Sequence, residues 1–264
     1  MANENQSNLH VMQRGEGTPL VLLHGFPFDH ALWRAQLHGL EGAGVRVIAP
    51  DLPGFGRSPS LAEGEASMDS YADAIAQWAK EEGLGKFILA GHSMGGYIAF
   101  AFVRRYAEML SGLVLVCTRP GADSEAAREG RYKLIEEVRK RGPQAVVDAM
   151  LPKLFAPSTA ESQSEAVDDT RQMMLRQSDE GIIAAIRAMA ERPDSTSGLE
   201  AINVPTLIIT GAEDAIIPAP EAEGMMSRIS GARHVPIANA GHLPMIEQPD
   251  AFNEALNSFI NSSH

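Results

Sequence analysis

Residues 89–100 read LAGHSMGGYIAF, a stretch in which three glycines surround a single serine, Ser93. Apolar residues precede this cluster and others follow it. Glycine weakens a regular helix or strand because its backbone loses the most conformational entropy on folding. Its repeated use at one point therefore indicates a turn in which Cβ atoms would not fit. The spacing Gly91-x-Ser93-x-Gly95 predicts a sharp strand-to-helix turn that holds the serine hydroxyl above the edge of a sheet.

The segments around this turn alternate between short apolar runs and longer runs with helical spacing. A weak strand is predicted at residues 9–13, and buried strands at residues 20–23, 45–49, 87–90 and 113–117. Apolar side chains recur three or four positions apart between them, which predicts helices at residues 31–40, 69–82 and 94–106. This alternation is typical of a mostly parallel sheet covered by helices on both faces, the α/β class.

The alternation stops near Arg119 and resumes at a strand predicted for residues 204–210. Only helical periodicity is found between these points. Beyond them the sequence predicts a helix at 220–229, a strand at 232–237 and a closing helix at 249–260. Because the sheet pattern continues, one interrupted α/β domain is a simpler interpretation than two independent domains. We predict a core of residues 1–118 and 197–264, and a helical cap or lid of residues 119–196.

Composition narrows the possible functions. The chain has 264 residues, with 34 acidic and 22 basic side chains and a formal net charge of -12. This charge disfavours nucleic acids and anionic membrane surfaces as partners. The single cysteine, Cys117, excludes an internal disulfide framework. No apolar run approaches the ~18 residues of a membrane span, and the first ten residues lack the apolar segment of a secretory signal. We expect a cytoplasmic protein that acts on a small molecule. Its oligomeric state is left open.

Four motifs, spread over nearly the whole chain, resemble those of the α/β-hydrolase superfamily. They are HGFP at residues 24–27, DLPGFGRS at 51–58, the serine turn, and the pair GAEDAIIP at 211–218 and AGHLPMIEQP at 240–249. The resemblance implies a mostly parallel sheet flanked by helices, with a helical cap inserted after the strand that ends at Cys117. It also implies a catalytic set in the chain order serine, acid, histidine.

The resemblance assigns three catalytic residues by their motifs and their order. Ser93 would be the nucleophile and His242 the general base. Asp214 would hold the imidazole in one tautomer and stabilise the imidazolium. Glu213 and Asp123 are rival acids, and Asp123 follows the preceding strand, where some family members keep the acid. Asp214 is the preferred assignment.

Other polar residues near these motifs have expected roles as well. Backbone N–H groups of Phe26 and Met94 would form the oxyanion hole. His24 and Asp51 are catalytic residue types, but we interpret them as a loop hydrogen-bonder and a turn former. His92 is expected to pack beneath the serine turn. No H-E-x-x-H or comparable ligand cluster is found and the glycines do not fit a dinucleotide fingerprint, so we expect neither a metal nor another cofactor.

The resemblance implies hydrolysis through an acyl-enzyme. We expect a carboxylic ester as substrate. Lactonase, C–C bond hydrolase and cofactor-free perhydrolase activities remain alternatives on the same fold. A small-molecule receptor with little turnover is an alternative of another class. Tyr97 stands where menaquinone-pathway enzymes of the family have arginine, and Leu243 begins a sequence that lacks the tryptophan typical of C–C hydrolases. Both differences favour the ester.

The expected acyl pocket is small and mainly apolar. Its predicted lining residues come from the core loops and from the insertion, and they are Phe28, Phe155, Met173, Met174, Ile216 and Leu243. Methionine is frequent in the insertion, and its flexible thioether adapts to varied apolar shapes. We therefore expect a mobile cap that sets the size of the substrate.

Overall fold

The computed structural model describes residues 9–61 and 64–262 of the chain. Part of the N-terminal segment, on which the prediction about a secretory signal rests, lies outside these residues. A seven-stranded sheet has the order β1-β3-β2-β4-β5-β6-β7. Its strands are β1 (Val11–Arg14), β2 (Thr18–Leu23), β3 (Val45–Pro50), β4 (Phe87–His92), β5 (Leu110–Val116), β6 (Thr206–Gly211) and β7 (Arg233–Ile237). β1 pairs antiparallel with β3, and all other neighbouring strands run parallel.

The central strands are buried on both of their faces. In β2, residues 20 to 23 have no exposed surface, and every residue of β4 is buried. A strand buried on both faces has no solvent side, so it reads as a continuous apolar run and not as an alternating one. This is the pattern that predicts these strands from the sequence.

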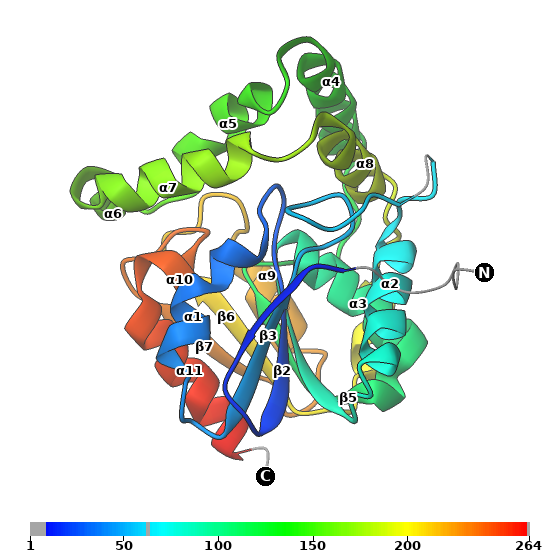
Figure 1. Ribbon diagram of the computed structural model, residues 1–264, viewed down its shortest axis with the longest axis vertical. Helices are drawn as coiled ribbons and strands as arrows, with labels where there is room; N and C mark the ends of the chain where they lie inside the picture. The colour runs from blue at the N-terminus through cyan, green and yellow to red at the C-terminus, as the bar shows by residue number, and fades with distance from the viewer. Residues whose placement is uncertain (1–8, 62–63, 263–264) are drawn as a thin grey trace.

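Helices cover the two faces of the sheet (Figure 1). On one face α1 (Arg34–Gly39) contacts α11 (Pro249–Ser262), and on the other α2 (Met68–Glu81) packs along α3 (Met94–Tyr106). The remaining core helices have three to seven residues each. They are η1 (His30–Trp33), η2 (Ala107–Met109), η4 (Thr196–Ala201), α9 (Pro220–Met226) and α10 (Pro244–Glu247). The three layers form an α/β fold, as the sequence predicts.

A helical segment, here called the helical insertion, lies between β5 and β6 and above the loops that leave the sheet (Figure 1). It contains α4 (Glu125–Arg141), α5 (Gln144–Met150), η3 (Leu151–Lys153), α6 (Pro157–Ser162), α7 (Ser164–Leu175) and α8 (Asp179–Ala190). The structure has no strand among the described residues between Val116 and Thr206. α4 packs along α8, and α5 contacts α7. The cap boundaries at 119 and 196 stay a prediction.

A buried carboxylate joins the helical insertion to the core. Asp29, on the loop after β2, is 1% exposed. Its two oxygens accept hydrogen bonds of 2.7 Å from the Nε and Nη2 atoms of Arg176, and Gln177 adds one of 3.0 Å from Nε2. The Gln177 side-chain oxygen in turn accepts the N–H of Gly56 at 2.9 Å. The C-terminal end of α7 is thereby fixed over two core loops.

Candidate active site

Ser93 sits on a strained turn between β4 and α3. Its φ and ψ are 52° and -110°, a left-handed conformation that residues with a Cβ rarely adopt. A Cβ atom on Gly91 would lie 2.3 Å from the carbonyl oxygen of Gly95, and one on Gly95 would lie 2.5 Å from that of Leu23. Both separations are shorter than any normal contact. Glycine is therefore required at both positions, and the turn presents Ser93 at the carboxyl end of the sheet.

His242 and Asp214 form a hydrogen-bonded pair beside this turn. The Nδ1 atom of His242 lies 2.9 Å from Oδ2 of Asp214. The other carboxylate oxygen accepts the N–H groups of Ile216 at 2.8 Å and Ile217 at 3.0 Å. An ionised carboxylate can only accept, so Nδ1 carries the proton. In the neutral imidazole this tautomer leaves the second ring nitrogen, Nε2, without a proton, and Nε2 can then act as a base.

The surroundings of Asp214 favour its ionised form. Burial by itself raises the pKa of this carboxyl. The interaction with His242 and the two backbone N–H groups outweigh burial and hold the pKa below its ordinary value. Cys117 is completely buried in the same region, with its sulfur within 4.8 Å of the polar atoms of Asp214 and His242. Burial, followed by the nearby negative charge of Asp214, raises the pKa of this thiol, so it stays protonated.

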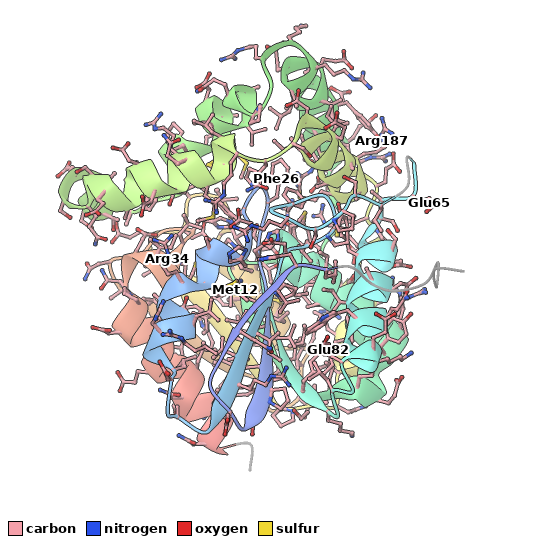
Figure 2. All side chains as sticks on the ribbon, in the orientation of Figure 1. Met12, Phe26, Arg34, Glu65, Glu82 and Arg187 are labelled. Carbon is pink, nitrogen blue, oxygen red and sulfur yellow. The ribbon has the colours of Figure 1, made fainter. Side chains whose placement is uncertain are left out.

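Two backbone N–H groups near Ser93 are available to bind an oxygen atom. Phe26 lies on the loop after β2, directly below the helical insertion (Figure 2). Met94 is the first residue of α3. Among the described residues, neither N–H donates to a protein acceptor. The N-terminal end of a helix also carries a partial positive charge, which favours an anion there.

The backbone of His242 is held from two sides. Its N–H donates to the carbonyl oxygen of Leu154 in the helical insertion at 2.8 Å. Its carbonyl oxygen accepts a 2.8 Å hydrogen bond from Nε2 of His92, which is fully buried beneath the serine turn. Burial, followed by the neighbouring His242, lowers the pKa of His92 to about 3, so its ring is neutral. His92 is therefore a fixed donor.

The polar residues interpreted as structural have local partners. His24 donates from Nδ1 to the carbonyl oxygen of Gly25, and its Nε2 accepts the N–H of Leu52, each at 2.9 Å. Burial lowers the pKa of His24. No hydrogen bond joins His24 to the His242–Asp214 pair among the described residues.

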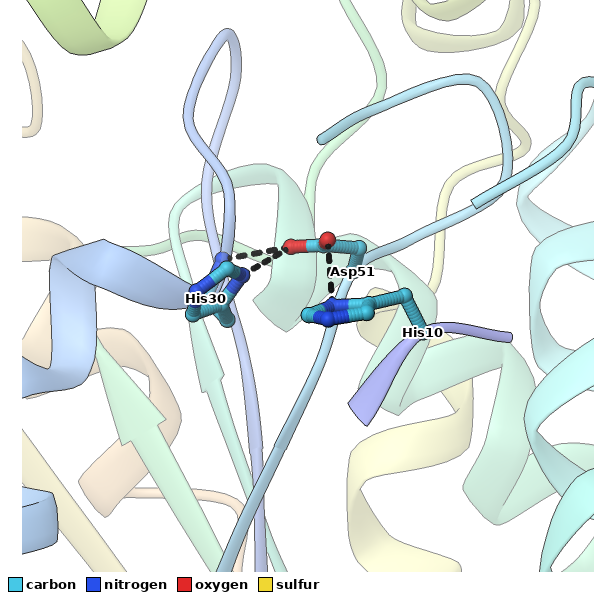
Figure 3. A group of neighbouring side chains, drawn as sticks. All are labelled: His10, His30 and Asp51. Carbon is cyan, nitrogen blue, oxygen red and sulfur yellow. Dashed lines mark hydrogen bonds and ion pairs between the residues drawn. The ribbon is translucent and has the colours of Figure 1, made fainter. Parts of the chain in front are cut away.

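Asp51 is the centre of a separate hydrogen-bonded cluster (Figure 3). Its Oδ1 atom accepts from the backbone N–H of His30 at 2.8 Å and from the His30 ring at 2.7 Å. Its Oδ2 atom accepts from the N–H of Arg57 at 2.9 Å and from the His10 ring at 3.0 Å. Burial raises the pKa of Asp51, but these donors, His30 foremost, bring it down to about 2. The cluster holds three chain segments together.

Two groups of side chains have the residue types of metal ligands. They are His10, His30 and Asp51, and Cys117, Asp214 and His242, with ligand atoms within 4.8 Å of one another in each group. In the first group both carboxylate oxygens already accept a backbone and a ring N–H. In the second, a histidine N–H bonds to a carboxylate and a protonated thiol lies beside them. Hydrogen bonding accounts for both arrangements, and the absence of a metal requirement stays a prediction.

The two rival acids have different surroundings from Asp214. Asp123 is 8% exposed and is paired with Arg119 at 2.9 Å, with Arg192 at 2.8 Å and with Arg131. Burial by itself raises the pKa of Asp123, but Arg131 and Arg192 outweigh burial and hold it below the ordinary value. Glu213 is exposed. Of the three carboxylates, Asp214 is the one that bonds to His242 among the described residues.

The six residues predicted to line an acyl pocket lie in different places. Phe28, Met174 and Leu243 have no exposed surface, and the ring of Phe28 lies 6.2 Å from that of His92. Met173 lines a groove between α7 and α1, whereas Phe155 lines a hollow among α5, α6 and α7. Neither of these two hollows is lined by Ser93 or His242. Ile216 is half-buried beside Asp214. Their role in substrate binding stays a prediction.

Two contacts near the site have no counterpart in the sequence analysis. Thr118 donates its hydroxyl to the carbonyl oxygen of Ser93 at 2.9 Å, which ties the serine turn to the end of β5. Glu247 is buried in α10 and accepts from N–H groups on both sides of His242. The sequence signal for Glu247 was its place in AGHLPMIEQP, five residues after the histidine.

A family model described as the alpha/beta hydrolase family matches residues 20–255 of the chain. The chain belongs to the alpha/beta hydrolase family. The structure of a thermophilic, malate-bound esterase from Thermogutta terrifontis matches this α/β hydrolase with a TM-score of 0.94 and 43% identity, covering 97% of this chain and 94% of that one. The fold and the superfamily predicted from the sequence are thereby confirmed.

Two curated relatives of this α/β hydrolase are named for different activities. A non-heme haloperoxidase from Rhodococcus erythropolis is 32% identical over 260 residues, which cover 94% of each chain. A pimeloyl-[acyl-carrier protein] methyl ester esterase from Aeromonas hydrophila is 28% identical, covering 95% of this chain and 98% of that one. The similar proteins thus include esterases, and the chain is a member of a hydrolase family. None of its described helices is both long and apolar enough to cross a membrane.

Proposed function

We propose that this α/β hydrolase cleaves carboxylic esters of small, mainly apolar acyl groups through a covalent acyl-enzyme. Ser93 is the nucleophile, His242 the base and Asp214 the orienting acid. The observation that carries the proposal is the 2.9 Å bond from His242 Nδ1 to Asp214, because it fixes the tautomer that leaves Nε2 as a base. The similarity to esterases over nearly the whole chain supports the same chemistry.

The reaction proceeds in two halves. His242 Nε2 removes the hydroxyl proton as Ser93 Oγ attacks the ester carbonyl carbon. The resulting oxyanion accepts from the N–H groups of Phe26 and Met94, and loss of one such donor typically costs about 10²–10³-fold in kcat. His242 then gives its proton to the departing alcohol, which leaves acyl-Ser93. A water molecule, deprotonated by His242, attacks the acyl carbon and releases the carboxylic acid. The helical insertion acts as a cap over this site.

The test is a panel of p-nitrophenyl esters and lactones assayed with the wild-type protein and with Ser93→Ala. We expect turnover of short and medium acyl esters by the wild type and loss of nearly all of it in the variant. The fold should persist in Ser93→Ala, because the turn accepts a smaller side chain. A fluorophosphonate should label the wild type at Ser93 and should not label the variant. Substantial esterase activity in purified Ser93→Ala would refute the mechanism, and absence of turnover by the wild type would favour a receptor.

Perhydrolysis is a second candidate, favoured by the 32% identity to a haloperoxidase. Hydrogen peroxide would replace water as the attacker of acyl-Ser93, so that the product is a peracid instead of the acid. The assay is bromide-dependent halogenation of a chromogenic acceptor in acetate and peroxide. Halogenation that depends on Ser93 would support this activity, and its absence alongside ester turnover would restrict the protein to hydrolysis.

A further inference from the structure

Glu247 is a buried carboxylate that accepts hydrogen bonds from backbone N–H groups. It lies in α10 and is 2% exposed. Its Oε1 atom accepts the N–H of Gly241 at 2.8 Å and that of Leu243 at 3.3 Å, while Oε2 accepts the N–H of Ala156 at 2.8 Å. No lysine, arginine or histidine among the described residues forms an ion pair with it. In the part of the chain that the structure describes, backbone N–H groups replace the water that this carboxylate loses on folding.

Such an arrangement is costly unless all of its bonds form together. Burying an ionised carboxylate is unfavourable, and charge-assisted hydrogen bonds are the interactions that offset the cost. An apolar side chain at position 247 would remove the charge but leave three N–H groups unsatisfied, at about 1–3 kcal/mol for each buried group. The three donors and the acid therefore stabilise one specific arrangement of two chain segments.

The two segments meet at the catalytic histidine. Gly241 and Leu243 flank His242 in the chain, whereas Ala156 belongs to the helical insertion. The contact leaves no free space, because a Cβ atom on Gly241 would lie 2.6 Å from the nitrogen of Ala156. The N–H of His242 itself donates to Leu154, two residues before Ala156. The loop that carries the base is thus built jointly by the core and by the insertion.

We propose that Glu247 is a positioning residue that fixes the loop of His242 and couples the helical insertion to the general base. The inference rests on the proposed function of His242. Any displacement of residues 154–156 is transmitted through Glu247 and Leu154 to the ring that must stay in contact with Asp214. Misplacement of a reacting group by about 1 Å can cost about 10²-fold in rate. Access to a substrate and activation of Ser93 are therefore linked through one side chain.

Glu247→Gln is the direct test, and Asp29→Asn is its matched control. Glutamine keeps the size of the side chain but offers one acceptor oxygen, so its amide NH₂ must face at least one backbone N–H. We expect kcat/KM for p-nitrophenyl acetate to fall by about 10–10²-fold. Asp29 is equally buried and also joins the insertion to the core, but among the described residues it makes no hydrogen bond to the histidine loop. Asp29 also caps η1 by accepting the N–H of Ala31 at 2.9 Å, and asparagine preserves that role. Because the change does not displace the base, kcat/KM should stay close to the wild-type value.

Two measurements separate positioning from a general loss of stability. Hydrogen exchange followed by mass spectrometry should show faster exchange in Glu247→Gln at both 154–156 and 241–243. Asp29→Asn should leave both segments protected. The downfield proton resonance of His242 Nδ1–H, bonded to Asp214, should broaden or disappear in Glu247→Gln and persist in Asp29→Asn. Thermal unfolding of both variants shows how much stability each has lost, so that their activities and exchange rates can be compared at similar stability.

Wild-type kcat/KM, exchange and resonance in Glu247→Gln would overturn the inference while leaving the proposed function intact. If Glu247→Gln does not fold, Glu247→Asp provides the same test. Its shorter carboxylate keeps the charge but cannot span both segments, so exchange should increase at one of them and kcat/KM should fall. Full activity and full protection in Glu247→Asp would again overturn the inference. Failure of the proposed function itself would appear differently, as a wild-type protein without esterase turnover or labelling of Ser93.

Discussion

Replacing Asp214 by asparagine should disable the base without disturbing its position. Oδ1 of Asp214 accepts from the N–H groups of Ile216 and Ile217, at 2.8 and 3.0 Å. These two donors require the amide oxygen of an asparagine in the same place, which turns its NH₂ toward Nδ1 of His242. Nδ1 must then accept, and the ring proton moves to Nε2. The nitrogen that should receive the proton of Ser93 is therefore already protonated.

The magnitude follows from this tautomer change. A triad aspartate replaced by asparagine with its geometry kept costs about 10⁴-fold in kcat, or about 5 kcal/mol of transition-state stabilisation. The assay is steady-state hydrolysis of p-nitrophenyl acetate at pH 7, with thermal unfolding as the control for folding. Asp123→Asn is the matched variant. It should lower stability because it leaves buried Arg192 without its carboxylate, but change kcat by less than about 10-fold. An Asp214→Asn protein within about 10-fold of wild type would refute the assignment.

Two further predictions concern stability and substrate size. Asp51→Asn should lower the free energy of unfolding at pH 7 by about 2.5 kcal/mol. This energy is the difference between the pKa values of 3.8 and about 2, multiplied by about 1.36 kcal/mol per pKa unit. Because the folded-state pKa is the lower one, this contribution to stability is present above pH 3.8 and disappears as the pH falls toward 2. Urea titrations of the wild type and Asp51→Asn at pH 7 and pH 3 test this pH dependence. An equal loss of unfolding free energy at both pH values would contradict it. Met173→Ala and Met174→Ala should shift the preferred ester chain length and spare the acetate; an unchanged p-nitrophenyl ester profile would assign both to internal packing.

The serine turn was predictable because its constraints are local. A Cβ atom at position 91 would clash with Gly95, and one at position 95 would clash with the adjacent strand β2. The spacing of the two glycines in the sequence is therefore enough to predict the sharp turn at Ser93. The helix predicted at 94–106 has the same bounds as α3, Met94–Tyr106. The helix predicted at 31–40 is instead divided into the 3₁₀ helix η1, which Asp29 caps through the N–H of Ala31, and the α-helix α1. Hydrophobic periodicity predicts a helix there but does not show where 3₁₀ hydrogen bonding gives way to α-helical hydrogen bonding.

The contacts that support His242 could not be predicted, because they join distant parts of the chain. His92 and His242 are 150 positions apart, and Ala156 and Glu247 are 91 positions apart. Their contacts depend on the order of the strands and on how the insertion folds back over them. The short helix α10 was also missed, because its four residues, Pro244–Glu247, span about one turn and carry no periodicity. Because no helix was predicted around Glu247, the sequence did not indicate where its side chain would lie.

The hydrogen bonds of the helical insertion argue against its motion as one rigid lid. Arg192 donates to the carbonyl oxygens of Gly121 and Met189, which joins the two ends of the insertion to each other. The insertion is tied to the core at Asp29, and again at Glu247 and His242. Opening the whole layer would break both sets of bonds to the core and would release His242 from its position. Segments of the insertion between these ties can move at lower cost. A substrate gate built from those segments would keep His242 in place while a substrate enters.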